Sequence, residues 1–394
     1  MTLVDKLMQT LVIFLTALAG ATSYPIRSRS SPQVNCACND SFTYTSGEAG
    51  ISKTHPKIEI DAAAREFVAK TARDLHLDLV ISEEGYDNWH GPSDPILYAG
   101  KLPYTVSGWD PACGLKSIFK SDMRWFRDGY KSKACNTFPR ERAMAFVLQT
   151  FAPHWPHAHI HESSPNQIGL SRAVRKRAKG GYTASQYYPS LSCGEKIPEF
   201  SAVSLDLENQ HCIEDNTFDL VLTQDVFEHI YDAAAAFKEI ARTLRPGGMH
   251  IFTTPLGSKR SPSFTMAEYK KEDRKIHLHF PPQIHGNPVA NGSIVTTMWG
   301  YDIADYIRQH TGMTTKIVHV TSRTMGLEHT DLIEVMVSVK TGNNSVLHKK
   351  VKGVSAPNIS DVCESIFITC TEQPYLNKQR KKPSRRNRKI KIHA

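Results

Sequence analysis

Apolar positions follow two different periods along the chain from about residue 157 onward. Short apolar runs predict strands at residues 157–163, 182–187, 202–205, 218–223 and 249–253. Apolar residues at helical spacing predict helices at 169–179, 233–244 and 302–310. Strands that alternate with helices are typical of a mainly parallel sheet covered on both faces. Two last strands, at 316–320 and 332–339, have only a short link between them, so we expect one of them to run antiparallel.

The chain before residue 157 is less regular. Residues 1–23 place one Lys ahead of an apolar run and an A-x-A sequence, which is typical of a secretory signal peptide or a short membrane anchor. Residues 24–58 are rich in Ser, Pro and Arg and predict a linker. The remaining patterns predict a helix at 60–75, a short strand at 77–82, an irregular aromatic lid or accessory layer at 83–135 and a helix at 140–151.

Six segments follow from these patterns. They are a signal peptide or anchor-like segment (1–23), a linker (24–58), an accessory or lid segment (59–152), the domain of alternating strands and helices (153–340), a C-terminal extension (341–377) and a basic disordered tail (378–394).

The net charge of +9 belongs to the tail. Nine of the 48 basic residues lie between Lys378 and Lys391, so the other 39 balance the 39 acidic residues. The chain outside the tail is formally neutral, so it offers no positively charged surface to a nucleic-acid duplex. This argues against nucleic acid as a partner. Residues 378–392 are suited instead to contact with a membrane or another anionic surface.

Cysteine and histidine are examined as possible metal ligands. The eight cysteines are Cys36, Cys38, Cys113, Cys135, Cys193, Cys212, Cys363 and Cys370. They are too sparse for a disulfide scaffold and include no CxxC pair, so we expect unpaired cysteines and no metal. Four histidines, His154, His157, His159 and His161, resemble a ligand cluster. We interpret them as packing or cleft-lining residues.

The residues at the strand ends carry the candidate chemistry, because open parallel sheets bind ligands beyond the carboxyl ends of their strands. In strand order they are Glu162, Ser163 and Ser164, then Gln186, then Asp206 and Leu207, then Gln224 and Asp225.

Four motifs within residues 205–248 point to a known family. They are an acidic D-x-E at Asp206, a D-x-x-F-D-x-V strand starting at Asp215, the pair Glu228-His229, and R-x-L-x-P-G-G starting at Arg242. In this order and spacing they resemble class I S-adenosylmethionine-dependent methyltransferases of the type 11 branch. The resemblance covers roughly residues 155–340. It implies a Rossmann-like, doubly wound, mainly parallel seven-stranded α/β sheet and S-adenosyl-L-methionine as the cofactor.

The resemblance also implies roles for the strand-end residues. Asp206 would accept a hydrogen bond from the adenine amino group, the Leu207 backbone would contact the ring, and Gln224 would lie below the methionine part. The family's glycine-rich first loop corresponds to Glu162-Ser163-Ser164 and continues to Gly169. Where the family has an acid that holds the ribose, this chain has Gln186.

Asp225 and His229 are the candidate catalytic residues, because a hydroxyl nucleophile must lose a proton to a base. The alternative is that Glu228-His229 caps the following helix. His277, His279 and His285 lie in an insert near the expected substrate mouth, either to orient a substrate or as loop polar groups.

The expected function is methyl transfer to an acceptor, taken to be a small molecule or glycan-like. One alternative is an inactive methyltransferase-like binding module, which the missing loop glycines favour. Another is a nucleic-acid methyltransferase steered by the tail. The N-terminal segment indicates a secretory or membrane location, whereas the resemblance indicates a cytoplasmic one.

Overall fold

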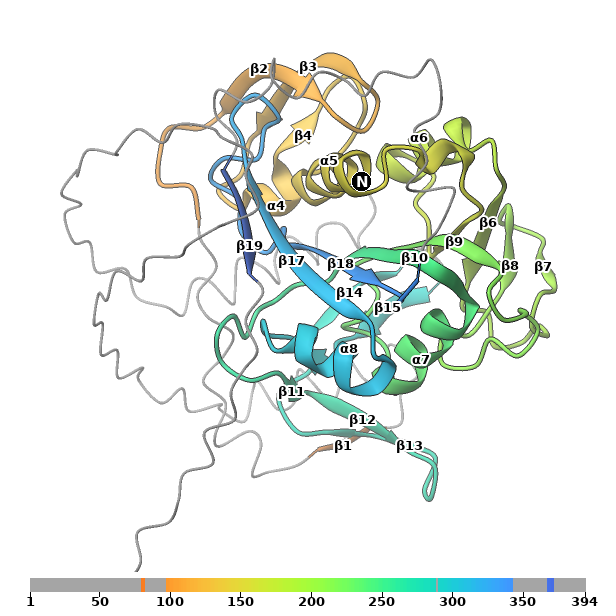
Figure 1. Cartoon of the computed structure of the whole chain (residues 1–394). Coiled ribbons are helices and arrows are strands. Elements are labelled where there is room, and N and C mark those ends of the chain that lie inside the picture. The colour runs from red at the N-terminus through yellow and green to blue at the C-terminus, as the bar shows by residue number, and fades with distance from the viewer. Residues whose placement is uncertain (1–78, 82–96, 288–289, 343–366, 372–394) are drawn as a thin grey trace, which may run out of the picture. The chain divides into compact units, whose positions relative to one another are not determined.

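The computed structural model describes residues 79–81, 97–287, 290–342 and 367–371. Its centre is a nine-stranded sheet in the order β19-β17-β18-β10-β9-β5-β6-β8-β7 (Figure 1). Five neighbouring strands are parallel: β5 (Ile160–Ser163), β6 (Tyr182–Gln186), β8 (Ala202–Ser204), β9 (Phe218–Gln224) and β10 (Leu244–Thr253). The other four are β7 (Lys196–Ile197), β17 (Thr314–Thr321), β18 (Val335–Val339) and β19 (Phe367–Thr371).

The predicted Rossmann-like sheet is confirmed, with two additions. β18 runs antiparallel to both β10 and β17, as the short link between the last two strands predicted. The seven predicted strands are extended by β7 at one edge and β19 at the other, each paired antiparallel with its neighbour. Both are edge strands.

Helices cover both faces of the sheet (Figure 1). α5 (Pro139–Phe151) and α6 (Gly169–Arg177) lie on one face, and α7 (Ala233–Thr243) and α8 (Ile303–Thr311) on the other. Along β9, Leu220 and Leu222 pack into the α5–α6 core, whereas Val221 packs into the α7–α8 core. Side chains alternate between the faces of a strand, so a strand buried on both faces must be apolar throughout.

α5 belongs to this architecture, although the sequence assigns it to the accessory segment 59–152. Met144, Val147 and Leu148 of α5 share one core with residues of β5, β9, β10 and β18. The predicted boundary at residue 153 therefore falls after a helix that already covers the sheet.

An antiparallel meander precedes α5. It consists of β2 (Tyr104–Asp110), β3 (Leu115–Ser121) and β4 (Lys131–Ser132), with the short helix α4 (Phe126–Gly129) before β4. The prediction of irregular structure was wrong here, because the polar–apolar alternation of these strands is imperfect. Phe119, Phe126 and Tyr130 form the meander's own small core.

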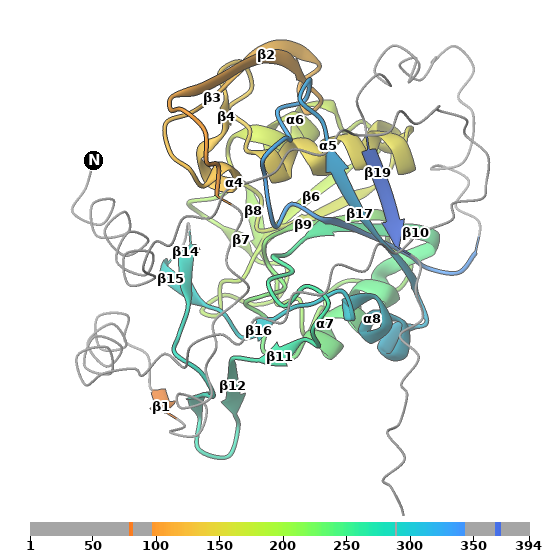
Figure 2. The same ribbon diagram turned by 90° about the vertical axis from the view of Figure 1, so that its left-hand side faces the viewer.

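An insert of short strands lies between β10 and α8, outside the main sheet (Figure 2). It contains β11 (Phe264–Thr265), β12 (Ala267–Lys270), β13 (Lys275–Leu278), β14 (Ile284–Asn287), β15 (Ala290–Ile294) and β16 (Thr297–Met298). β1 (Leu79–Ile81) pairs in parallel with β13, which places the predicted strand at 77–82 beside the insert. β14 and β15 form a hairpin.

The expectation of unpaired cysteines was wrong for four of them. Cys113 is bonded to Cys135 and Cys193 to Cys212, with Cα–Cα distances of 6.1 and 5.8 Å. The partners are 22 and 19 residues apart in sequence, so only the fold brings them together.

The Pro246-Gly247-Gly248 turn lies within β10 and does not cap α7. α7 ends at Thr243, and the strand pairing begins at once with Leu244 opposite Phe218. Gly247 takes its φ of +78° inside an irregularity of β10 rather than at the helix end.

Several predictions lie outside the described residues. They concern the signal-like segment, the linker, the helix at 60–75, the basic tail, and the cysteines Cys36, Cys38 and Cys363. Within the described residues, no helix has both the length and the apolar character needed to cross a membrane.

Candidate functional site

The sheet reverses its strand order between β5 and β9. From β5 the chain continues outward to β6 and β8, and from β9 it continues outward to β10 on the other side. The carboxyl ends of β5 and β9 meet there, and the Gln224 amide donates to the Glu162 carboxylate across them (3.1 Å). Such a switch point is where open α/β sheets bind ligands.

Glu162 is a buried hub at this point. Its carboxylate accepts hydrogen bonds from Ser171 Oγ (2.5 Å), Tyr182 OH (2.8 Å) and Gln224 Nε2 (3.1 Å). Burial raises the pKa of Glu162, although the three donors oppose that shift. Glu162 thus fixes the orientation of the Ser171, Tyr182 and Gln224 side chains.

Gln224 presents a free acceptor as a result. Its Nε2 donates to both Glu162 and Ser171 Oγ, which fixes the orientation of the amide. Its Oε1 is buried and has no hydrogen-bond partner in the described part of the structure. A buried acceptor without a donor costs free energy, so this oxygen is suited to the ammonium group of an amino-acid ligand.

Asp206 follows β8 and is held by its own turn. Its Oδ1 accepts the Glu208 N–H (2.9 Å), while Oδ2 makes no hydrogen bond to any described residue. The Leu207 side chain is buried in the α7–α8 core and anchors this turn. Asp206 therefore offers a carboxylate oxygen at the sheet edge that is free to accept a further hydrogen bond.

The first loop makes its tight turn without glycine. Ser164 has a φ of +56° and donates its N–H to the Ser185 carbonyl (2.8 Å). Gly169 has a φ of +62°, and a side chain there would overlap the Glu141 carboxylate of α5. Glu141 Oε1 accepts the Leu170 N–H (3.0 Å) at the N-terminus of α6. Sequence reasoning missed this contact.

Replacing Ser164 with glycine is expected to raise the free energy of unfolding by about 0.5–1 kcal/mol, because glycine adopts a positive φ without a Cβ penalty. Urea unfolding of the full chain measures it. The matched control is Ser163→Gly in β5, which is expected to lower stability because glycine weakens a strand. Equal effects of the two changes would contradict the strain assigned to Ser164.

Gln186, at the end of β6, is 7% exposed and lines a small cavity with Pro165 and Gln167 of the first loop. The cavity volume of about 10 Å³ is room for roughly one water molecule. Gln186 is thus placed beside the first loop, as the family resemblance requires of the residue at the ribose position.

Asp225 is held between two arginines that the sequence did not single out. Arg127 of α4 and Arg140 of α5 reach Asp225 Oδ2 at 2.7 and 2.8 Å, and Thr253 Oγ1 donates to Oδ1 (3.0 Å). Burial raises the pKa of Asp225, but the two arginines outweigh burial and lower it to about 2. A carboxylate so firmly ionised is a weak proton acceptor, which disfavours the general-base role for Asp225.

His229 lies in the loop between β9 and α7. Its Nδ1 is 2.8 Å from the Ile294 carbonyl, and its Nε2 faces Glu228 at 3.8 Å. The alternative that Glu228-His229 caps α7 was wrong, because Asp232 caps it by accepting the Ala235 N–H (2.9 Å).

Two of the four clustered histidines have packing contacts. His161 is buried, bonds Ser185 Oγ (2.8 Å) and stacks on Phe218; burial lowers its pKa to about 4. His159 Nδ1 lies 3.1 Å from the Thr217 carbonyl.

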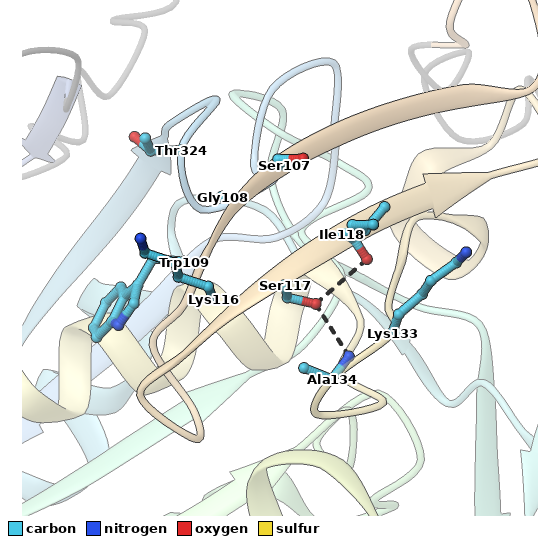
Figure 3. Close-up of a pocket in the computed structure, with 9 residues that line it drawn as sticks. All are labelled: Ser107, Gly108, Trp109, Lys116, Ser117, Ile118, Lys133, Ala134 and Thr324. Carbon is cyan, nitrogen blue, oxygen red and sulfur yellow. Dashed lines mark hydrogen bonds between the residues drawn. The ribbon is translucent and has the colours of Figure 1, made fainter.

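A separate open hollow of about 800 Å³ lies on the meander, as Figure 3 shows. Ser117 accepts the Ala134 N–H (3.1 Å) in its floor. Its lining comes from the meander and from Thr324, and includes none of the strand-end candidates.

Comparison with known proteins agrees with this architecture. Residues 169–252 match a family model described as a methyltransferase domain. Phosphoethanolamine N-methyltransferase 3 of Arabidopsis thaliana is 35% identical over 80 residues, which are 19% of this chain and 16% of the relative. Phosphoethanolamine N-methyltransferase 1 of the same plant is 35% identical over 65 residues, 16% and 13% of the two chains. The matched segment thus spans less than a fifth of these relatives' length.

Two solved methyltransferase structures are among those similar to this chain. An S-adenosylmethionine-dependent methyltransferase from Mesorhizobium loti is 14% identical, with a TM-score of 0.33, over 50% of this chain and 97% of its own. The 1,6-didemethyltoxoflavin-N1-methyltransferase of Burkholderia thailandensis, solved with bound S-adenosylhomocysteine, is 13% identical, with a TM-score of 0.32, over 51% and 79% of the two chains.

Residues 169–252 are thus similar to a methyltransferase domain, and they lie within the sheet whose strand order reverses between β5 and β9. The motifs at Asp206, Glu228-His229 and Pro246-Gly247-Gly248 all lie inside this matched segment.

Proposed function

We propose that this chain transfers a methyl group from S-adenosylmethionine to a small-molecule or glycan-like acceptor. The observation that carries the proposal is a pair of acceptors at the carboxyl ends of the parallel strands, Asp206 Oδ2 after β8 and Gln224 Oε1 at the end of β9, which no described residue satisfies. They suit two donor groups of that cofactor, its adenine amino group and its ammonium group. The cofactor supplies a methyl carbon activated by a cationic sulfonium.

The two candidate catalytic residues take different parts in this proposal. Asp225 joins α4 and α5 to the end of β9 through Arg127 and Arg140. Its position directly after Gln224 supports a place near the cofactor, and its two arginine partners argue against a part in proton transfer. His229 is the remaining basic group, because the Ile294 carbonyl fixes the proton on Nδ1 and leaves the Nε2 lone pair free.

Calorimetric titration of the full chain with S-adenosylmethionine and S-adenosylhomocysteine tests the cofactor site. Asp206→Ala is expected to weaken both affinities at least about tenfold, the value of one hydrogen bond to a charged group. Asp122→Ala is the control, because Asp122 is an exposed aspartate of the meander that pairs with Lys120. Failure of the folded chain to bind either ligand would overturn the proposal and favour the inactive binding module.

The two disulfides also bear on location. Disulfides persist in oxidising compartments and are rare in the cytosol. The Cys113–Cys135 and Cys193–Cys212 bonds therefore favour the secretory interpretation of residues 1–23 over the cytoplasmic one. Alkylation of the native chain followed by mass spectrometry is expected to leave these four cysteines unmodified until a reductant is added. Modification before reduction would contradict this.

A further inference from the structure

Glu228 has a carboxylate oxygen that the fold buries and does not satisfy. The side chain is 2% exposed, and its Oε2 accepts the Thr254 hydroxyl (2.8 Å). Its Oε1 has no hydrogen-bond partner in the described part of the structure. An unpartnered buried carboxylate oxygen is costly, so a positively charged or donating group is expected beside it.

Two histidine nitrogens face this oxygen. His229 Nε2 and His285 Nδ1 each lie 3.8 Å from Glu228 Oε1, and the three atoms all lie within 4.8 Å of one another. These separations are too long for hydrogen bonds. They leave a gap between one carboxylate oxygen and two imidazole nitrogens.

The His229 ring is already oriented as metal-binding histidines are. Its Nδ1 donates to the Ile294 carbonyl (2.8 Å), which fixes the tautomer and leaves the Nε2 lone pair toward Glu228. Histidine ligands almost always donate their second ring N–H to a carbonyl or carboxylate in this way. Thr254 gives Glu228 a corresponding support through Oε2.

The backbone around the three side chains is braced from two elements. Thr296 donates its N–H to the Glu228 carbonyl (2.7 Å) and its hydroxyl to the Ile230 carbonyl (2.6 Å), so the insert holds the β9–α7 loop. His285 comes from β14 of the same insert, opposite Ser293 of β15. The loop and the hairpin are thus fixed relative to each other without an ion.

We propose that Glu228, His229 and His285 form a binding site for one divalent transition-metal ion, such as Zn²⁺ or Mn²⁺. Two imidazoles and one carboxylate are a donor set for these ions rather than for Mg²⁺ or Ca²⁺, which prefer oxygen ligands. Such ions bind their ligand atoms at about 2.0–2.2 Å. To reach these distances, the three ligand atoms would have to move closer to one another by between a fraction of an ångström and about 1.5 Å. The partial exposure of His285 leaves the remaining coordination positions open to solvent.

The other ligand-like group in the described residues has a different explanation. Asp110, Cys113 and Cys135 also lie close together, but the two sulfur atoms are bonded to each other. A disulfide supplies no thiolate, so that group is not a metal site while oxidised.

The open positions indicate the class of acceptor, a point that rests on the proposed methyl transfer. Glu228 follows Gln224 and Asp225 within the loop at the switch point, so the ion would lie on the acceptor side of the site. A divalent ion binds hydroxyl oxygens and lowers their pKa, which favours an acceptor that presents a hydroxyl group. With the ion bound, His229 Nε2 would be a ligand and no longer a free base, so the acceptor's proton would leave to solvent water at the open coordination positions.

Titration of the chelator-treated full chain with Zn²⁺ tests the site, in the absence of any cofactor and without a polyhistidine tag. We expect one equivalent to bind saturably. Glu228→Gln and His285→Ala are each expected to weaken binding by about 100-fold or more, and Thr254→Val by about tenfold, the usual range for a supporting contact. Circular dichroism confirms that each variant is folded.

The matched control is His279→Ala, a half-exposed histidine of the same insert that faces Glu268 rather than Glu228. It is expected to bind Zn²⁺ as the parent does. Absence of saturable binding, or binding that survives both Glu228→Gln and His285→Ala, overturns the proposal. Because no cofactor is present, a chain that binds Zn²⁺ but not S-adenosylmethionine would refute the proposed function and keep the metal site.

Discussion

Arg142→Met is expected to lower the free energy of unfolding by about 4 kcal/mol or more. Arg142 lies on α5 with no exposed surface, and its guanidinium donates to four backbone carbonyls. Those carbonyls belong to Tyr130 (3.0 Å), Thr137 (2.7 Å), Met325 (2.8 Å) and Gly326 (2.7 Å). One side chain thereby joins the meander, α5 and the loop between β17 and β18.

Methionine keeps much of the apolar volume of Arg142 but none of its donors. Four buried carbonyls would lose a hydrogen bond, and each unsatisfied group costs about 1 kcal/mol or more. The cation–π contact with the Phe119 ring (4.5 Å) is lost as well. Burial lowers the pKa of Arg142 to about 10, which still leaves it charged at neutral pH. Urea unfolding of the full chain, followed by tryptophan fluorescence, measures the loss.

Arg124→Met is the control for Arg142→Met. Arg124 also donates to two carbonyls, those of Tyr98 and Gly100, but at an exposed site. Water replaces the lost donors there, so the expected change is below about 0.5 kcal/mol. Similar losses of unfolding free energy in Arg142→Met and Arg124→Met would show that burial of the Arg142 hydrogen bonds does not determine their contribution.

The main sheet was predictable because its signals are local. The run Phe218–Thr223 is apolar on both faces, so it requires helices on both sides of its strand. Asp206 is the acidic residue that follows the third predicted strand, so its neighbours in sequence are enough to recognise it as a strand-end group. Patterns of this kind need only a few consecutive residues to be recognised.

The parts that the sequence missed depend on residues far apart in the chain. Arg127 is 98 residues from Asp225 in sequence, and nothing near either residue indicates that they pair. His285 and Glu228 are brought together by a hairpin whose strands are too short to have a clear period. The pair Glu228-His229 did indicate a functional site in the sequence. It was also interpreted as a helix cap, although Asp232 is the better cap.

Arg127→Met is expected to lower the free energy of unfolding by about 3 kcal/mol at pH 7, because it leaves the mostly buried Asp225 with a single arginine partner. The Arg127 side chain is 9% exposed and its Nη2 lies 2.7 Å from Asp225 Oδ2. Its Nε also donates to the Leu332 carbonyl (2.9 Å), which would lose its donor. Arg308→Met on the exposed face of α8 is the control and is expected to have little effect.

The pH dependence of this loss separates the ion pair from simple packing. The pKa of Asp225 is about 2 in the folded chain, against about 3.9 in an unfolded one. Because the folded pKa is the lower one, the ion pair stabilises the fold fully above about pH 4, and this contribution disappears as the pH falls toward 2. The difference in unfolding free energy between the parent and Arg127→Met should therefore shrink as the pH falls from about 5 toward 2. A difference that stays constant over this range would mean that Arg127 acts through its packing and its bond to Leu332, and not through the charge of Asp225.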